Sequence, residues 1–481
     1  MASPLFARSI IATVPVALSS GLSSVLIGSV TSHHELPASS TSGGEAAHSA
    51  VSSRIQEGGN TVPRHRHILT AATTALLLSV STAGCTDEYV DGVTLRLVVA
   101  DYEVRGQSDN TEQYWNDLIT AFEAAHPDIK VKVDVEPWDY VDGKVAAMAK
   151  AGQAPDLAQL KSYADFAERG DLYSVDSLVS IPVQSNFVRS FAIAGEHDGT
   201  QYAMPFTAST RLLFYNEDLF AEAGIRNPPK TWDELKAAAQ KLNTRTRVSY
   251  PIAVPLGPEE AEIEAMAWML GGEGGYTNST GSYAINSKNN LNSLKWLREN
   301  LVAEGLTGPV PVNKLNRRDA YAAFLRGEAG MVNGHPSLLQ AAKAAGIRVG
   351  VAPVPSRSGE STPAPAAVDW MMAFKRNGLR KELGTFLNFV FKDENVREFA
   401  TRNNLLPVTV TVTEQMKADV EHEDLRKFLE ELPASELPPV GKNSWAVVSD
   451  SIKRNIGTAM TSGGSPATTL EVIAGDARKA E

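Results

Sequence analysis

The stretch TLRLVVADYEVRGQSDNTEQYWNDLITAFEAAHPDIKVKVDV, residues 94–135, decides the fold. Its first seven residues are rich in β-branched side chains and predict a buried strand. Residues 111–126 carry apolar side chains at helical spacing, and Pro127 ends that helix. Residues 129–135 alternate between apolar and polar side chains, which is typical of a half-buried strand. The order strand, helix, strand predicts a parallel βαβ unit and therefore an α/β fold.

The same alternation continues along the chain. We expect a helix over 139–151, and a hairpin turn at Asp198-Gly199 between strands at 191–194 and 201–206. Thr231 and Glu234 form a capping box that begins a helix. Other helices are predicted over 289–304, 319–326, 379–391 and 444–458, and other strands over 157–160, 211–215, 329–332, 349–354 and 370–374.

The only cysteine of the 481 residues, Cys85, ends the segment TTALLLSVSTAGC. Basic residues at 64–67, a short apolar run and small residues give the layout of a secretory signal peptide, which we place at 62–84. The segment resembles the lipobox of bacterial lipoproteins, with Thr82 where that motif usually has Leu. We therefore expect a lipidated Cys85 that anchors the chain to the outer face of the cytoplasmic membrane. The alternative is a small buried thiol.

Residues 1–61 precede this signal and hold a Ser-, Gly-, His- and Ala-rich region without periodicity. Such a composition cannot bury enough apolar surface to fold. Because a signal peptide begins a protein, we hypothesise that translation starts at Val62 from a GTG codon. Residues 1–61 are then not part of the natural protein, and they are disordered if they are made.

The part of the chain that begins at Cys85 is too long for a single core, so we expect two lobes. The whole sequence has 45 Lys and Arg against 56 Asp and Glu, a net charge of −11. An acidic chain without a basic patch argues against nucleic acid as a partner. After Cys85 no apolar run is long enough to cross a bilayer, and a single cysteine forms no internal disulfide.

Six segments in the same order resemble the bacterial extracellular solute-binding proteins of family 1, the receptor components of ABC importers, a group that includes maltose-binding protein. The segments lie at 111–138, 152–160, 198–225, 228–242, 324–334 and 368–375. With the looser match around them, the resemblance covers roughly residues 95–478, which is nearly all of the chain after Cys85.

The resemblance implies a periplasmic-binding-protein-like fold, with two α/β lobes joined by crossover hinge strands and a ligand cleft between them. Lobe one is expected at 92–208 and 350–402, and lobe two at 212–347 and 405–478. It also implies a sugar or oligosaccharide ligand, capture by lobe closure, delivery to the transmembrane subunits of an ABC permease, a monomer, and no cofactor.

Open α/β sheets bind ligands at the carboxyl ends of their strands, and a sugar site needs flat aromatic faces beside polar groups. In the first lobe these rules select Tyr102, Glu103, Trp138, Lys161 and Tyr163, because each follows a predicted strand. A surface tryptophan is the alternative interpretation of Trp138. Asp156, which caps a turn after Pro155, is interpreted as structural.

Other candidates lie at the crossover and in the second half of the chain: Ser209, Arg211, Asn333, His335, Asp369, Trp370 and Trp445. Ser209 stands where maltose-binding protein has a ligand-contacting glutamate, which argues against a maltodextrin. Trp445 stands at a position like that of a stacking tryptophan in the same protein. A structural histidine is the alternative for His335, and packing between the lobes is the alternative for Trp370.

The other tryptophans are interpreted as helix packing: Trp115, Trp232, Trp268 and Trp296. The acidic residues Glu259, Glu260, Glu262 and Glu264 are interpreted as the solvated start of a helix, where negative charge suits the helix dipole.

A secreted glycoside hydrolase is the alternative from another class, since it needs only two well-placed carboxylates. The sequence contains no nucleophile elbow, HExxH motif, P-loop, dinucleotide fingerprint or Cys/His cluster. We therefore expect a binding protein without enzymatic activity and without a metal. A sensory lipoprotein on the same fold stays open, because a fold does not set a function.

Overall fold

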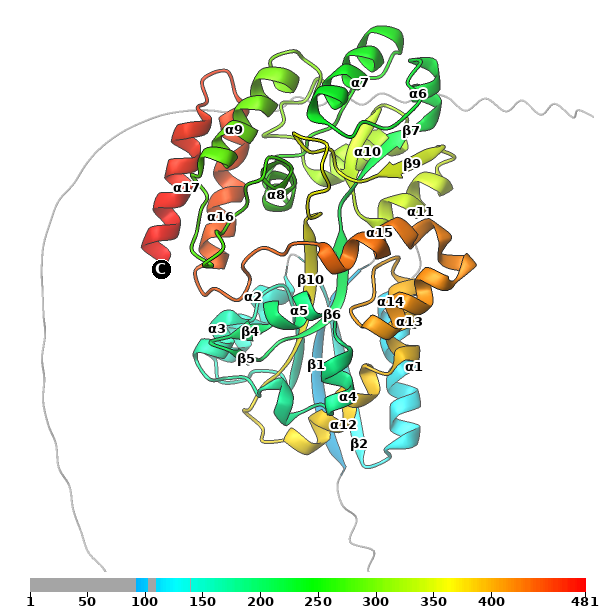
Figure 1. Ribbon diagram of the computed structural model, residues 1–481. Helices are drawn as coiled ribbons and strands as arrows, with labels where there is room; N and C mark the ends of the chain where they lie inside the picture. The colour runs from blue at the N-terminus through cyan, green and yellow to red at the C-terminus, as the bar shows by residue number, and fades with distance from the viewer. Residues whose placement is uncertain (1–91, 103–109, 139) are drawn as a thin grey trace, which may run out of the picture. The chain divides into compact units, whose positions relative to one another are not determined.

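Two β-sheets organise the residues that the computed structural model describes, which are 92–102, 110–138 and 140–481 (Figure 1). One sheet has five strands in the order β2-β1-β3-β10-β6, and the other has three in the order β8-β7-β9. Helices pack around each sheet, so the fold has two α/β lobes, as predicted (Figure 1). The predicted signal peptide and Cys85 lie outside the described residues.

The strands of the first lobe's sheet are β1 (Val93–Asp101), β2 (Ile129–Pro137), β3 (Leu157–Leu160), β6 (Met204–Thr210) and β10 (Ala366–Ala373). β1 pairs in parallel with both β2 and β3, which confirms the βαβ prediction. β10 is antiparallel to β3 and to β6. The carboxyl ends of β1, β2, β3 and β6 therefore share one edge of the sheet with the start of β10.

Eight helices and a short hairpin accompany this sheet (Figure 1). The helices are α1 (Asn110–Ala125), α2 (Val141–Lys150), α3 (Ala164–Glu168), α4 (Ile181–Asn186), α5 (Arg189–Ala194), α12 (Arg380–Val390), α13 (Asp393–Arg402) and α14 (Val410–Ala418). The hairpin consists of β4 (Glu196–His197) and β5 (Thr200–Gln201). Asp198 and Gly199 join its strands with φ of 48° and 74°, so the predicted turn is confirmed.

The second lobe's sheet is antiparallel and consists of β7 (Leu212–Asn216), β8 (Met331–Gly334) and β9 (Val349–Ala352). Its helices are α6 (Glu217–Glu222), α7 (Trp232–Arg245), α8 (Ala261–Gly271), α9 (Lys288–Leu297), α10 (Arg317–Leu325), α11 (Pro336–Ala344), α16 (Trp445–Asn455) and α17 (Pro466–Ala480). The predicted capping box is present: Thr231 accepts from the Glu234 backbone, and the Glu234 carboxylate accepts from the Thr231 backbone.

Shorter helical turns and one linking helix complete the described chain. α15 (Arg426–Glu431) packs Phe428 against Phe214 of β7, with ring centroids 6.0 Å apart. The 3₁₀ turns are η1 (Val175–Ser177), η3 (Val420–Leu425), η4 (Leu432–Ala434) and η5 (Ile456–Met460), and η2 (Arg298–Val302) is a π-helical extension of α9. In the described part of the chain no helix is both long and apolar enough to cross a membrane.

The tryptophans interpreted as packing residues lie in the two cores. Trp115 is fully buried and stacks on Phe206, with centroids 5.5 Å apart. Trp232, Trp268 and Trp296 pack together in the second core, where neighbouring ring centroids are 4.9 to 6.3 Å apart. Each of these large side chains removes a large apolar area from water.

The structure differs from the predicted elements at two places. Residues 191–194, predicted as a strand, form the end of α5, and the hairpin has only two residues on each side of its turn. The lobe boundaries also shift: β9 pairs with β7 of the second sheet, and Leu406 pairs with Ala208 of β6. The second half of the chain therefore returns to the first sheet later than residue 350 and stays with it beyond residue 405.

Candidate functional site

A buried hydrogen-bond chain lies at the edge where the parallel strands end. Tyr102, directly after β1, donates its hydroxyl proton to Asp369 of β10 and accepts from the Gln159 amide of β3. Burial raises the pKa of Asp369 to about 7, and the Tyr102 hydrogen bond only partly opposes this rise. Burial and the Asp369 charge likewise raise the pKa of Tyr102 well above its ordinary value. Asp369 therefore exchanges a proton near neutral pH.

An aromatic and cationic corner adjoins this chain. Trp138, directly after β2, is half-buried and meets the Tyr102 ring edge-on, with centroids 5.3 Å apart and an interplanar angle of 84°. The Lys161 ammonium, after β3, lies 4.9 Å from the Trp138 ring centroid. The Lys161 backbone N–H donates to the Asp142 carboxylate over 3.1 Å. The corner thus places an indole face beside a cation and a carboxylate.

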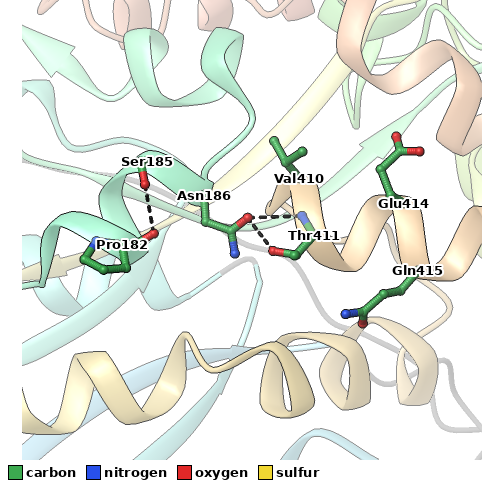
Figure 2. A pocket seen from close by; sticks show the side chains of 7 residues that line it. All are labelled: Pro182, Ser185, Asn186, Val410, Thr411, Glu414 and Gln415. Carbon is green, nitrogen blue, oxygen red and sulfur yellow. Dashed lines mark hydrogen bonds between the residues drawn. The ribbon is translucent and has the colours of Figure 1, made fainter.

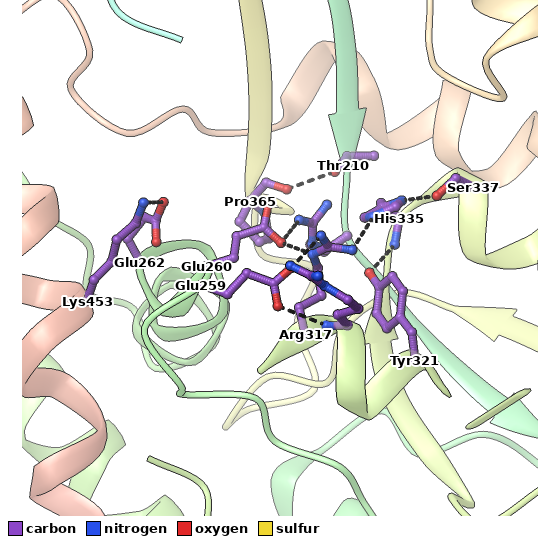
Figure 3. A network of polar contacts seen from close by, with 12 residues as sticks. Thr210, Glu259, Glu260, Glu262, Arg317, Tyr321, His335, Ser337, Pro365 and Lys453 are labelled. Carbon is purple, nitrogen blue, oxygen red and sulfur yellow. Dashed lines mark hydrogen bonds and ion pairs between the residues drawn. The ribbon is translucent and has the colours of Figure 1, made fainter. Parts of the chain in front are cut away.

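A second polar cluster begins at the single residue between β6 and β7. Arg211 is 4% exposed, and its Nη2 lies 2.9 Å from Oε2 of Glu260. The same carboxylate oxygen lies 2.7 Å from Nε of Arg317, whose Nη2 is 2.8 Å from Glu259 (Figure 3). Burial pushes the pKa of Glu260 up, but the charges of Arg211 and Arg317 outweigh it and leave the pKa lowered. The cluster is therefore a network of ionised, partly desolvated groups.

His335, after β8, lies beside these guanidinium groups. Its Nε2 is 3.4 Å from Nη1 of Arg317, and its Nδ1 is 2.7 Å from the Ser337 hydroxyl (Figure 3). Burial, together with the charges of Arg211 and Arg317, lowers the pKa of His335 well below its ordinary value. The imidazole is therefore neutral. Since Nε2 accepts from Arg317, Nδ1 carries the proton and donates it to Ser337.

Asn333, on β8, takes part in a third buried polar contact. It is 5% exposed, and its amide donates to the Glu264 carboxylate over 3.1 Å. The Trp268 indole N–H donates to the same oxygen over 2.9 Å. Burial raises the pKa of Glu264 to about 7. Asn333 and Glu264 therefore support the start of α8 from inside the second lobe.

The two clusters belong to one electrostatic region. The Lys161 charge acts on both Asp369 and Glu260, and the Glu260 charge acts on Asp369. The Arg211 backbone N–H donates to the Pro365 carbonyl, next to the start of β10, over 3.1 Å. Polar side chains of both lobes therefore face one region at the β6–β7 crossover.

Three predicted ligand residues lie elsewhere. Trp370 and Tyr163 are fully buried and pack against each other with centroids 5.5 Å apart, and the Tyr163 hydroxyl lies 2.6 Å from the Ala194 carbonyl. The pairing of β10 with β6 shifts register between Asp369 and Trp370, and Asp369 is half-buried whereas Trp370 is fully buried. Trp445 is 7% exposed and packs against Tyr276. All three are core residues in this structure, and ligand contact by any of them stays a prediction.

Ser209 and Glu103 complete the predicted set. Ser209 is half-buried on β6 opposite Ala367 and has no part in either cluster. Glu103 lies outside the described residues. The structural role predicted for Asp156 is confirmed, because its carboxylate accepts from the Arg96 backbone over 2.7 Å and from the Asn377 amide.

The acidic run at the start of α8 is not the solvated surface that we predicted. Glu259 and Glu260 pair with Arg317, Glu262 lies 3.1 Å from the Lys453 ammonium, and Glu264 is 6% exposed. A carboxylate at the start of a helix is solvated only when no cationic side chain contacts it. Here Arg211, Arg317 and Lys453 reach these carboxylates from distant parts of the chain.

The sequence analysis missed Gln159, Arg317 and Tyr321 as candidate site residues and interpreted Glu260 as solvated. The Tyr321 hydroxyl accepts from the His335 backbone N–H over 3.1 Å. Gln159 had a signal, because it is the one polar residue of the buried strand LAQL and such a residue needs a buried partner. Arg317 and Tyr321 had none, since they lie on an ordinary amphipathic helix.

Figure 2 shows a hollow that is separate from these clusters. It lies between α4 and α14 and is lined by Pro182, Ser185, Asn186, Val410, Thr411, Glu414 and Gln415. Asn186 already accepts a hydrogen bond from the Thr411 backbone over 3.1 Å. The hollow holds neither an aromatic ring nor a cation.

Comparisons with known proteins show the family and the fold of the chain. Residues 108–397 match the family described as bacterial extracellular solute-binding protein. A binding protein of Brucella abortus (strain 2308) is 29% identical over 399 residues, which covers 80% of this chain and 93% of the relative. The maltotriose-binding protein of Pyrococcus abyssi is 29% identical over 249 residues, 51% of each chain.

Solved structures show the same fold. The cyclic alpha-maltosyl-1,6-maltose binding protein from Arthrobacter globiformis matches with a TM-score of 0.69 at 18% identity, over 81% of this chain and 99% of that chain. The family and these relatives are binding proteins and not enzymes. The chain belongs to the family of bacterial extracellular solute-binding proteins.

Proposed function

We propose that this protein is the extracytoplasmic receptor of an ABC importer, and that it captures a sugar or oligosaccharide by lobe closure and delivers it unchanged to a membrane permease. The observation that carries the proposal is the half-buried Trp138 ring, which lies beside Tyr102 and Lys161 at the edge where the strands end. Sugar-binding relatives with the same fold support it.

The chemistry of this edge suits a carbohydrate. The apolar C–H face of a sugar ring can stack on the Trp138 indole, while its hydroxyl groups can bond to Asp369, Lys161 and the Arg211–Glu260 pair. Nη1 of Arg211 is buried and has no hydrogen-bond partner among the described residues. An unmet buried donor costs about 1–3 kcal/mol, which a ligand oxygen would recover.

The position of these groups also suits capture by closure. Lys161 and Asp369 belong to the first lobe, whereas Glu260 and Arg317 belong to the second, yet their charges influence one another. A ligand that contacts both sets favours the arrangement in which the lobes are closest. Asn333, His335, Ser209 and Glu103 stay candidates for further ligand contacts.

The experiment is isothermal calorimetry with a panel of mono- and oligosaccharides, followed by recovery of the ligand. We expect one sugar class to bind stoichiometrically and to return chemically intact. Trp138→Ala should weaken binding at least tenfold. The matched control is Tyr173→Ala, because Tyr173 is a half-buried aromatic residue at the opposite end of β10. No heat with any sugar, or equal losses in both variants, would contradict the proposal.

Lipid anchoring is a separate part of the proposal and has a separate test. Expression in a bacterial host should give a membrane-bound protein whose N-terminal peptide begins at a diacylglyceryl-modified Cys85. Cys85→Ser should release the protein from the membrane and preserve sugar binding. Mass spectrometry of the precursor also tests the hypothesis that translation starts at Val62, since peptides from residues 1–61 would refute it.

A further inference from the structure

Three side chains that can bind a metal meet on the first lobe, away from the sugar region. Glu168 is the last residue of α3, and His197 and Asp198 lie in the β4–β5 hairpin. Nε2 of His197 is 2.8 Å from Oε2 of Glu168 and 3.8 Å from Oδ2 of Asp198. One donor atom of each residue lies within 4.8 Å of the other two. Figure 1 shows α3 beside this hairpin.

The spacing is close to that of a coordinated ion. Zinc binds nitrogen and oxygen ligands at about 2.0–2.2 Å, so two tetrahedral ligands lie roughly 3.4 Å apart. The separations of 2.8 and 3.8 Å from the His197 nitrogen lie on either side of that value. The His197 side chain is 12% exposed, whereas those of Glu168 and Asp198 are 59% and 92% exposed. Small side-chain rotations are therefore enough to form the site, and water can complete the coordination.

The other ring nitrogen of His197 is already held in place. Its Nδ1 lies 3.2 Å from the Gly441 carbonyl, an acceptor that requires the proton on Nδ1. Nε2 therefore faces the two carboxylates and now donates to Glu168 over 2.8 Å. A metal ion would take the place of that proton, which is released to water, while Nδ1 keeps its bond to the backbone carbonyl, as in other metal-binding histidines. Gly441 also lies close to the hairpin. A Cβ atom added to Gly441 would lie only 2.8 Å from the carbonyl oxygen of Glu196.

The charge around this group favours a cation. Glu168 and Asp198 have no ion pair with Lys or Arg in the ranges that the structure describes. Both carboxylates lie beside His197, and Glu168 also has a side-chain hydrogen bond with Asn443. Once Nε2 has released its proton, two carboxylates beside the neutral imidazole carry a charge of −2, which a divalent ion would neutralise. Nitrogen together with carboxylate oxygen suits zinc and related transition metals better than calcium or magnesium.

We propose that Glu168, His197 and Asp198 bind a divalent transition-metal ion of the zinc type at the surface of the first lobe. Through the Gly441 carbonyl the ion would also brace the segment that leads into α16 of the second lobe. The proposal does not depend on the sugar-binding role. The sequence contains no metal motif for these residues, because Glu168 and His197 are 29 positions apart.

Calorimetric titration of the full chain with zinc chloride in a non-chelating buffer tests the site. Five other histidines precede Cys85, so the measurement is the difference between proteins. We expect His197→Ala to lose one zinc equivalent or at least tenfold in the affinity of one site, and Glu168→Gln to weaken the same site. His126→Ala is the matched control, since the His126 ring packs on Phe122 and has no carboxylate partner among the described residues; it should bind like the wild type.

A second measurement separates this site from zinc bound before Cys85. Zinc should raise the melting temperature of the wild type and of His126→Ala, because an ion held by the native fold stabilises it by mass action. It should not raise the melting temperature of His197→Ala, and calcium should raise none of them. The proposal is overturned if His197→Ala binds zinc with the wild-type stoichiometry and affinity, or gains the same thermal shift.

Discussion

Asp369 shows how one buried carboxyl group can tie stability to pH. Its pKa is raised from an ordinary value near 3.8 to about 7 in the folded protein. Below about pH 4 the group is protonated in both the folded and the unfolded chain. Between about pH 4 and pH 7 only the unfolded chain releases the proton, so the free energy of unfolding falls as pH rises.

Asp369→Asn should remove this pH dependence, because asparagine does not titrate. We expect the free energy of unfolding of the wild type relative to the variant to fall by up to about 4 kcal/mol between pH 4 and pH 8. Urea unfolding across that range measures it. Glu264 titrates in the same window in both proteins, so its contribution cancels. A difference that stays constant with pH would show that Asp369 titrates normally.

Trp370 should act on stability and not on ligand contact. Its side chain is fully buried beside Tyr163 and Gly195, so Trp370→Ala leaves a large cavity. We expect the free energy of unfolding to fall by about 3–5 kcal/mol. Denaturant unfolding checks this, with Trp138→Ala as the comparison, because Trp138 is only half-buried and should cost less. If Trp370→Ala weakens sugar binding and leaves stability unchanged, the core assignment is wrong.

At the level of single residues, the sequence predicted part of the candidate site. Tyr102, Trp138 and Lys161 follow strands, and strand ends are visible in the apolar pattern. Asp369 was selected because it begins a predicted strand, and Arg211 because it lies at the predicted crossover. Glu260 and Arg317 were not, because their importance comes from an ion pair between residues that are far apart in the chain. Trp370 lies in the core, and the sequence left packing open for it because an aromatic residue in a strand looks the same in sequence whether it faces a ligand or a core.

The capping box of α7 gives a prediction at the scale of one element. Thr231→Ala removes the acceptor for the Glu234 backbone N–H, which is 3.1 Å from the hydroxyl oxygen. We expect a loss of about 1 kcal/mol in the free energy of unfolding. Asp233→Ala is the control, since Asp233 is exposed in the same turn and does not cap the helix. Equal losses in the two variants would mean that first-turn charge matters more than the cap.

Secondary structure was the easiest level to predict. The helix over 111–126 and the strand over 129–135 correspond to α1 and β2, because their apolar residues repeat with the period of each element. The error at 191–194 has a physical cause. A run of six residues is too short for its period to separate a strand from the helix α5, and packing against the sheet decides between them.

The whole molecule should become more compact when the sugar binds. The two sheets are joined directly at β6–β7, and polar groups of both lobes face the crossover. Small-angle X-ray scattering should show a smaller radius of gyration with saturating ligand. Trp138→Ala should need at least tenfold more ligand for the same decrease in radius. Tight binding without any change in the radius would show that the lobes do not move.

Arg211 stands alone between the last residue of β6 and the first residue of β7, with its guanidinium inside the ion-pair cluster. In a rigid-body rotation, atoms near the rotation axis move least and atoms far from it move most. If the lobes rotate about β6–β7, the charged groups beside this crossover keep their partners during closure, while distant helices move much farther. Ligand-binding side chains placed at the crossover can therefore keep their positions after one ligand leaves and before the next one binds.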